Sequence, residues 1–136
     1  MSKITEKFPG SKILLVDDYF INQELAKDLL EIMECTVDIA EDGEEAITKY
    51  QETDYNAIIM DIQMPVKDGY QATREIRELE KSNGKHVPII AITANALQGD
   101  DQKCYDAGMD AYISKPLDPK KLEEILKKFL TKKAST

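Results

Sequence analysis

The chain has 136 residues, a formal net charge of −8 and a sequence pI near 4.7. This length suits one domain with its own core, and the negative charge opposes non-specific binding to nucleic acid, which requires a basic surface. The apolar runs are too short to span a bilayer, and the polar start Met1–Gly10 lacks the apolar core of a signal peptide. We therefore expect a cytoplasmic domain without nucleic acid or membrane as a partner.

The first predicted strand is Lys12–Val16, a continuous apolar run that ends at Asp17 and Asp18. Apolar residues then recur mostly at three- and four-residue spacing, which predicts an amphipathic helix. Its stripe consists of Ile21, Leu25, Leu29, Ile32 and Met33. The β-branched stretch Thr36–Ala40 predicts a second strand. Asp42 is then suited to cap a helix that runs to about Gln51.

The central strand is predicted at Asn56–Met60, and Asp61 follows it directly. A loop with Pro65 and Gly69 comes next. The helix after this loop is indicated by four residues at helical spacing and is expected to end near Gly84; the four are Tyr70, Thr73, Ile76 and Leu79.

The last third of the chain predicts a fourth strand at Pro88–Thr93, a weakly apolar helix at Leu97–Ala107 and a short strand at Ala111–Ser114. Asp118 and Pro119 have the residue types preferred at the N-cap and first position of a final helix. Four apolar residues predict the buried stripe of that helix: Leu122, Ile125, Leu126 and Phe129.

Strand and helix thus alternate five times, and the strands are apolar on both faces. This pattern predicts an α/β fold, a doubly wound five-stranded parallel sheet with helices on both sides. We expect the domain to span residues 11–131, between solvated tails at 1–10 and 132–136. Cys35 and Cys104 have no close cysteine partner and are expected to be reduced. His86 is expected to be an exposed loop residue.

Polar residues stand at the carboxyl ends of four of the predicted strands: the pair Asp17 and Asp18, then Asp61, Thr93 and Lys115. The carboxyl ends of parallel strands lie at one edge of a sheet, so these residues are expected to be neighbours. Three clustered carboxylates repel one another, and a hard divalent cation, Mg²⁺ or Mn²⁺, relieves that repulsion. With a lysine and a threonine hydroxyl to bind phosphoryl oxygens, such a site suits phosphoryl transfer.

From Lys12 to Leu130 the chain resembles the receiver domain of two-component response regulators, whose fold is flavodoxin-like. The resemblance lies in the acidic pair after the first strand, in Met-Asp-Ile-Gln-Met-Pro-Val-Lys-Asp-Gly around Asp61, in Ile-Thr-Ala-Asn-Ala around Thr93, and in Lys115-Pro116. Asn22-Gln23 and Thr-Ala-Asn-Ala are similar to the receivers of hybrid histidine kinases. A free-standing regulator and a segment of a longer protein both remain open.

The resemblance implies that Asp61 accepts a phosphoryl group from a histidine kinase or a histidine phosphotransfer protein. It also implies that Asp18, Asp61 and the backbone carbonyl of Gln63 bind the metal directly, and that Asp17 acts mainly through a metal-bound water. Thr93 and Lys115 would bind the phosphoryl group.

The resemblance further implies that Lys115-Pro116 is a cis peptide and that Tyr112 is a switch aromatic, which turns inward when Thr93 moves toward the phosphate. It links Gln63 and Asn95 to the rate of dephosphorylation. Output is expected to pass through contacts with an unidentified protein, or the phosphoryl group to pass onward to a histidine.

Two other functions are compatible with parts of the pattern. A Mg²⁺-dependent phosphohydrolase would use the same aspartyl intermediate, but Gln63 stands where an acidic general acid/base would be needed. A phosphate-independent, flavodoxin-like binding module is disfavoured because no Gly-rich or Ser/Thr-rich phosphate loop follows the first strand. The phosphorylation switch is the interpretation that the residues favour.

Overall fold

The computed structural model describes residues 7–62, 64, 67–93, 100–114 and 117–130. Within these residues, five strands alternate with helices in the predicted order. The elements are β1 (Lys12–Val16), α1 (Phe20–Ile32), β2 (Thr36–Ala40), α2 (Gly43–Glu52), β3 (Ala57–Asp61), α3 (Gly69–Asn83), β4 (Ile89–Thr93), α4 (Asp100–Ala107), β5 (Ala111–Ser114) and α5 (Pro119–Leu130). The expected first residues of the fourth helix, before Asp100, lie outside the described residues.

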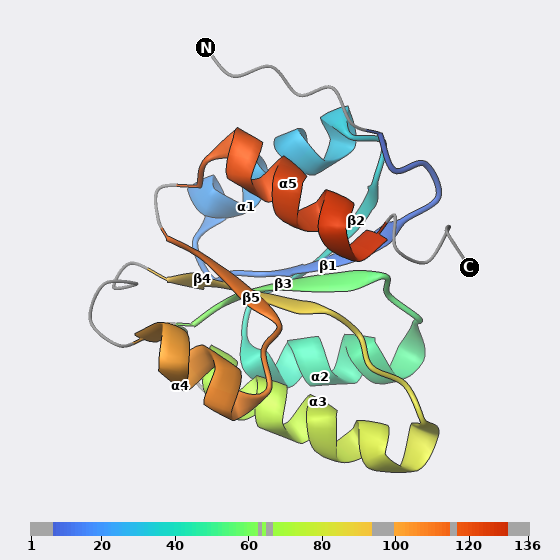
Figure 1. Cartoon of the computed structure of the whole chain (residues 1–136), viewed down its shortest axis with the longest axis vertical. Coiled ribbons are helices and arrows are strands. Elements are labelled where there is room, and N and C mark those ends of the chain that lie inside the picture. The colour runs from blue at the N-terminus through green and yellow to red at the C-terminus, as the bar shows by residue number, and fades with distance from the viewer. Residues whose placement is uncertain (1–6, 63, 65–66, 94–99, 115–116, 131–136) are drawn as a thin grey trace.

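The strands form one parallel sheet in the order β2-β1-β3-β4-β5. Helices α1 and α5 cover one face of this sheet, and α2, α3 and α4 cover the other (Figure 1). The chain therefore has the doubly wound, flavodoxin-like fold that its pattern predicts. The strand order reverses at β1, so the connections from β1 and β3 leave toward opposite faces and open a crevice at their carboxyl ends.

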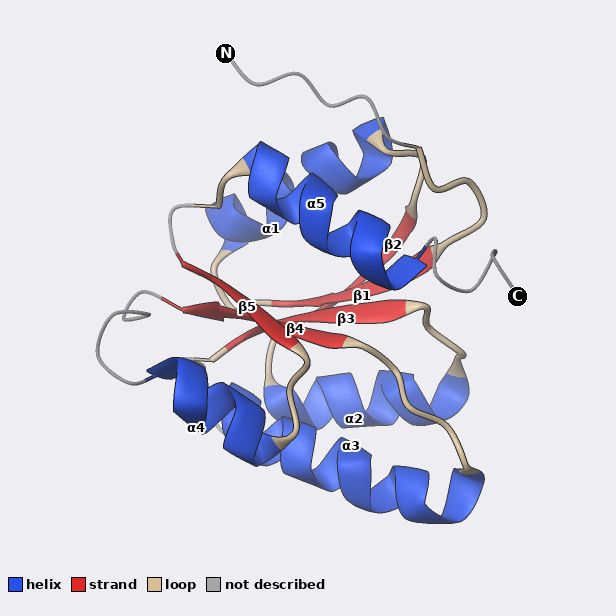
Figure 2. Cartoon of the chain, viewed as in Figure 1, coloured by secondary structure: helices blue, strands red, loops and turns tan. Residues whose placement is uncertain are grey.

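Helices lie on both faces of the sheet (Figure 2), and alternate residues of the strands contribute to two separate core layers. Leu14 and Val16 of β1 pack into the layer that includes residues of α2 and α3. Ile13 and Leu15 pack into the layer that includes residues of α1 and α5. Because both faces of the sheet are buried at its centre, strands β1, β3 and β4 are apolar between their ends, and the polar side chains at their carboxyl ends mark the sheet edge.

The helix ends follow from local sequence. The Asp42 side chain accepts a hydrogen bond from the Glu45 N–H at 2.8 Å, and Asp68 with Gln71 forms a capping box at α3. Asp118 accepts from the Lys120 N–H at the start of α5. Three helices thus begin where an aspartate satisfies backbone N–H groups that lack an intrahelical partner.

The apolar stripe predicted for the first helix faces the core only in part, since Met33 is buried and Leu29 packs against the core. Ile21 is 60% exposed and Leu25 is 48% exposed, whereas Ala26 and Leu30 are buried. The prediction that the apolar stripe marks the buried face is therefore wrong for Ile21, Leu25 and Ile32. Gln23 lies on the buried face instead, where its side chain donates to the Asp17 carbonyl, a contact that requires this face of α1 to point inward.

The predicted N-terminal tail is also wrong in part. Phe8 is 5% exposed and belongs to the core layer shared with α1 and α5. Its backbone N–H donates to the Met33 carbonyl at 2.7 Å. A large aromatic side chain beside the end of α1 gains more from burial than from hydration, so the folded unit includes Phe8.

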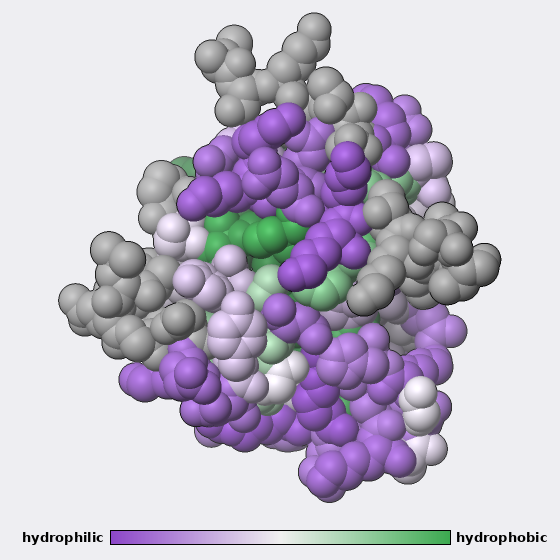
Figure 3. Space-filling view, viewed as in Figure 1, coloured by the Kyte–Doolittle hydropathy of each residue, from purple (hydrophilic) through white to green (hydrophobic). Residues whose placement is uncertain are grey.

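Other expectations about single residues are confirmed. Cys35 and Cys104 are buried in the core and form no disulfide, and His86 is an exposed loop residue whose Nε2 lies 2.7 Å from Asp110 Oδ1. The face in Figure 3 is largely hydrophilic, with a hydrophobic area beneath α5. Ile125 and Phe129 of α5 are half-buried against the core. Among the helices of the described residues, none has the length and apolar character needed to cross a membrane.

Candidate functional site

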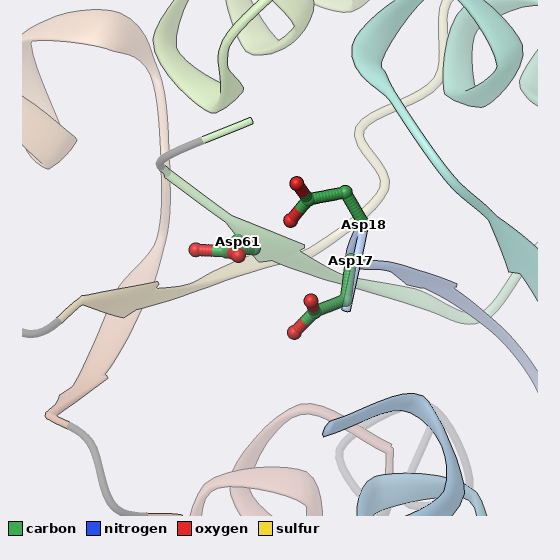
Figure 4. A group of neighbouring side chains, drawn as sticks. All are labelled: Asp17, Asp18 and Asp61. Atoms are coloured by element: carbon green, nitrogen blue, oxygen red, sulfur yellow. The ribbon is translucent and has the colours of Figure 1, made fainter. Parts of the chain in front are cut away.

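Three aspartates from two adjacent strands meet at the carboxyl edge of the sheet. Asp17 and Asp18 directly follow β1, and Asp61 is the last residue of β3. One oxygen from each carboxylate lies within 4.8 Å of the others, and all three side chains point to the same side of the strand ends (Figure 4). Asp17 and Asp61 are each 2% exposed, whereas Asp18 is exposed. The predicted acidic cluster is therefore present.

Hydrogen bonds at Asp17 stabilise the turn that carries the acidic pair. Its backbone N–H donates to the Ala40 carbonyl of β2 at 3.0 Å. Its side-chain Oδ1 accepts from the Tyr19 N–H at 2.9 Å, and its carbonyl accepts from Gln23 Nε2 at 2.7 Å. Sheet, turn and helix α1 thus each contribute one contact to the position of Asp17.

The start of α3 packs closely against the backbone at Asp61 and Ile62. A Cβ at Gly69 would lie 2.6 Å from the Asp61 carbonyl oxygen and 2.9 Å from Ile62 Cα, so a larger residue would displace the backbone beside Asp61. The Gly69 N–H donates to the Ile62 carbonyl at 2.9 Å. A glycine is therefore needed at position 69 so that α3 can approach the backbone of β3 closely. The sequence had indicated Gly69 only as a loop residue.

Thr93 is buried at the end of β4, where it pairs in register with Ser114 of β5. Lys115 follows Ser114, but Lys115, Pro116, Gln63 and Asn95 lie outside the described residues. Tyr112 is half-buried in β5, and its ring meets Tyr105 of α4 edge-on, with centroids 6.2 Å apart.

The acidic cluster fits a small hard cation. Carboxylate oxygens are the ligands that Mg²⁺ prefers, and two ligands on opposite sides of one Mg²⁺ are separated by about 4.2 Å. The carboxylate oxygens of the cluster lie within 4.8 Å of one another, which is near this spacing. Some of the carboxylates could therefore bind the cation directly while another acts through a bound water. A bound cation would also offset the mutual repulsion of the carboxylates.

Comparisons with known proteins identify the family. The family model described as "Response regulator receiver domain" matches residues 13–127, so the chain belongs to the receiver domain family of two-component signalling. Domains of this class are phosphoacceptor switches rather than conventional enzymes, which favours the switch over the phosphohydrolase and the phosphate-independent module.

Similar curated proteins are hybrid kinases. The chain is 43% identical over 120 residues to hybrid signal transduction histidine kinase I of Dictyostelium discoideum, covering 85% of this chain and 7% of that protein. A second kinase of the same organism, kinase L, is 44% identical over 122 residues, covering 87% of this chain and 7% of that protein. The chain thus spans a small fraction of these relatives.

Two solved structures are informative. The receiver domain of sensor histidine kinase PA1611 from Pseudomonas aeruginosa PAO1, which has a magnesium ion coordinated in its active site cleft, is 45% identical with a TM-score of 0.81, covering 89% of this chain and 98% of that one. The receiver domain of Saccharomyces cerevisiae Ssk1, solved with the histidine phosphotransfer protein Ypd1, is 31% identical with a TM-score of 0.89, covering 95% and 94%.

One contributor to the site was not predicted from the sequence. Gln23 donates to the backbone of Asp17 from the buried face of α1. A signal was present, since Gln23 is a polar residue next to the acidic turn. The inward orientation of the Gln23 side chain was not predictable, because the apolar stripe suggested that a different face of the helix is buried.

Proposed function

We propose that the chain accepts a phosphoryl group on Asp61 from a phosphohistidine and thereby switches a surface that binds another protein. An oxygen of the Asp61 carboxylate attacks phosphorus, a P–O bond forms, and the P–N bond of the phosphohistidine breaks. The imidazole leaves with the bonding electron pair. Dephosphorylation follows when water attacks the same phosphorus and restores the carboxylate.

The neighbouring residues have separate roles in this proposal. Asp18, Asp61 and the Gln63 carbonyl would hold Mg²⁺ directly, with Mn²⁺ as an alternative, and Asp17 would act mainly through water. The cation would neutralise charge on the phosphoryl oxygens. Thr93 and Lys115 would bind the remaining oxygens of the phosphoryl group. Catalysis of both transfer and hydrolysis would then belong to the domain itself.

The observation that carries the proposal is the position of Asp61, a buried carboxylate at the end of a central strand within 4.8 Å of two further carboxylates. The test is the intact mass after incubation with acetyl phosphate and Mg²⁺. We expect a phosphoryl adduct on the native chain, loss of the adduct in Asp61→Asn, and loss with excess chelator.

Asp28→Asn is the matched control, because Asp28 is an exposed aspartate on α1. It should label like the native chain. A folded Asp61→Asn variant that still gains the adduct would exclude Asp61 as the acceptor, and undiminished labelling in chelator would exclude the metal role.

The protein donor is proposed to dock on α1. This helix exposes apolar side chains from its first residue, next to the acidic turn, to its last: Phe20, Ile21, Leu25 and Ile32. A histidine phosphotransfer protein is the occupant we propose, because the similar Ssk1 receiver was solved in complex with one. An apolar stripe next to a charged site suits a partner that must bring a histidine toward Asp61.

This docking proposal separates donor binding from chemistry. Leu25→Ser should slow phosphoryl transfer from phosphorylated Ypd1 while acetyl phosphate labelling stays at the native rate. Lys128→Ser, an exposed change on α5, serves as the control for both donors. Equal losses with both donors would point to damage at the site instead.

Output is proposed to involve Tyr112, whose ring contacts Tyr105 at the surface between α4 and β5. Phosphorylation would shift the population between two arrangements of this aromatic pair. We propose that residues 11–131, together with Phe8, form the phosphoacceptor unit, which exchanges phosphoryl groups with a kinase or phosphotransfer protein in the cytoplasm.

A further inference from the structure

Gln23 is a polar side chain on a helix face that otherwise packs into the core. It is 6% exposed, and its neighbours on the buried face of α1 are Ala26 and Leu30. A buried amide is costly unless it is hydrogen-bonded. Gln23 Nε2 donates to the Asp17 carbonyl at 2.7 Å, a buried bond across six positions of the chain.

This bond completes a closed set of contacts around the acidic turn. Tyr19, the N-cap residue of α1, makes no capping hydrogen bond with its side chain. Instead its N–H donates to Asp17 Oδ1 at 2.9 Å, and its carbonyl accepts from the Gln23 N–H at 3.0 Å. Gln23 therefore contacts both ends of the turn, through its backbone at Tyr19 and through its side chain at Asp17.

The turn needs such support because it carries two of three mutually repelling carboxylates. Without a cation, the repulsion among Asp17, Asp18 and Asp61 favours any movement that separates them. A bond to the Asp17 carbonyl from the rigid body of α1 resists that movement. Groups that orient metal ligands in this way raise affinity, because less rearrangement is needed when the cation binds.

We infer that Gln23 is a positioning residue for divalent cation binding, acting through the backbone carbonyl of Asp17 rather than by touching the cation. The inference rests on the proposed metal site and adds a residue to it. It assigns to α1 a second role besides donor docking: the buried side of the helix orients the acidic turn.

The test is isothermal titration calorimetry with Mg²⁺ alone on the native chain, Gln23→Met and the control Gln51→Met. Methionine has the length of glutamine and fills the apolar face but cannot donate a hydrogen bond. We expect the Kd for Mg²⁺ to rise roughly tenfold in Gln23→Met, as is typical when a residue that orients a metal ligand is lost. Gln51 is exposed at the far end of α2, so its variant should bind like the native chain.

The melting temperature in chelator separates positioning from general stability. Loss of the bond and gain of apolar burial oppose each other, so the cation-free Gln23→Met protein should melt near the native temperature. A folded variant with native affinity for Mg²⁺ overturns the inference. If Gln23→Met does not fold, Gln23→Asn, which keeps the amide but falls short by one methylene, gives the same comparison.

The two proposals can fail separately. A native chain that binds Mg²⁺ but does not gain a phosphoryl adduct refutes phosphorylation at Asp61, and the Kd of the Gln23 variants still decides the role of Gln23. A native chain that binds no Mg²⁺ overturns both the metal site and this inference.

Discussion

The backbone N–H of Gly43, at the start of α2, donates to the carbonyl of Lys67 at 3.1 Å, in the loop that follows β3. A Cβ at Gly43 would lie 2.5 Å from that carbonyl oxygen. The Lys67 side chain also pairs with Glu44 of α2 at 2.9 Å and with Glu75 of α3. The loop after Asp61 is thus connected to helices α2 and α3.

Gly43→Ala is therefore expected to destabilise the fold. The contacting atom belongs to backbone and cannot rotate away, so the loop or the helix must shift, which costs about 1–3 kcal/mol. Urea unfolding measures the loss. Thr48→Ala, an exposed change on the same helix, should stay within about 0.5 kcal/mol of the native chain. Equal stability of the two variants would contradict the close contact.

A partly buried ion network joins α3 to the segments before β4 and β5. Arg77 donates to the Gly108 carbonyl at 2.8 Å, to Glu80 at 2.6 Å and to Asp110 at 2.7 Å. Glu80, only 7% exposed, also accepts from the Val87 N–H. The arginine thus supports a nearly buried carboxylate and two connections at once.

Removing the arginine leaves the Glu80 charge buried without its cation. We expect Arg77→Met to lower the free energy of unfolding by about 3–5 kcal/mol, the usual effect of breaking a buried pair from one side. Arg74→Met is the matched control, because Arg74 is exposed on the same helix. If urea unfolding shows that Arg77→Met loses less than about 1 kcal/mol of unfolding free energy, which is the usual contribution of an exposed ion pair, the network adds little to stability.

The acidic cluster predicts that Asp17→Asn is more stable than the native chain without a cation but is stabilised less by Mg²⁺. In chelator, Asp17→Asn should raise the free energy of unfolding by about 1 kcal/mol, because it removes one of three neighbouring negative charges. The asparagine Oδ1 can still accept from the Tyr19 N–H. With saturating Mg²⁺, the variant should gain less stability than the native chain, since its affinity for the cation is lower.

Thermal unfolding with and without Mg²⁺ checks both signs. An unchanged or lower melting temperature for Asp17→Asn in chelator would count against repulsion within the cluster. An unchanged gain from Mg²⁺ would count against any part for Asp17 in binding the cation.

Burial of Cys35 predicts a loss of stability at alkaline pH. Burial raises the pKa of the Cys35 thiol from 9.0 to about 11. Between these values the unfolded chain has released the proton and the folded chain retains it, so the free energy of unfolding falls as the pH rises, by up to about 1.4 kcal/mol per pH unit from this thiol. Below pH 9 the thiol is protonated in both states and contributes no pH dependence.

Cys35→Ala removes this group, so the native chain should lose stability more steeply than the variant between pH 9 and pH 11. Urea unfolding at pH 7 measures the packing cost of the substitution separately. Parallel stability curves for the two proteins across the alkaline range would contradict the raised pKa.

Much of the fold was predictable because its signals are local. Apolar runs predicted the strands, and Asp42 and Asp118 predicted the starts of two helices. The position of Asp61 at a strand end followed from the same local pattern. These features depend on a few neighbouring residues and on backbone groups that must find partners wherever the segment lies.

Other features depended on how segments pack. Large apolar residues on α1 suggested its buried face, yet Ile21 and Leu25 are exposed while Gln23 is buried. Phe8 was expected in solvent and lies in the core. Neither outcome follows from helical periodicity, because the rotation of a helix on a sheet is set by its connecting turn and its neighbours.

The sequence by itself therefore determined the elements, their order and the edge of the sheet where the carboxylates gather, since each of these follows from short-range pattern and from the geometry of parallel strands. Only the tertiary structure decided how close the carboxylates lie, that Gly43 and Gly69 must leave room for backbone, and that Gln23 supports Asp17. These contacts join segments that are distant in the sequence, or depend on how a helix is rotated against the sheet. Their distances therefore depend on the register and crossing of whole elements.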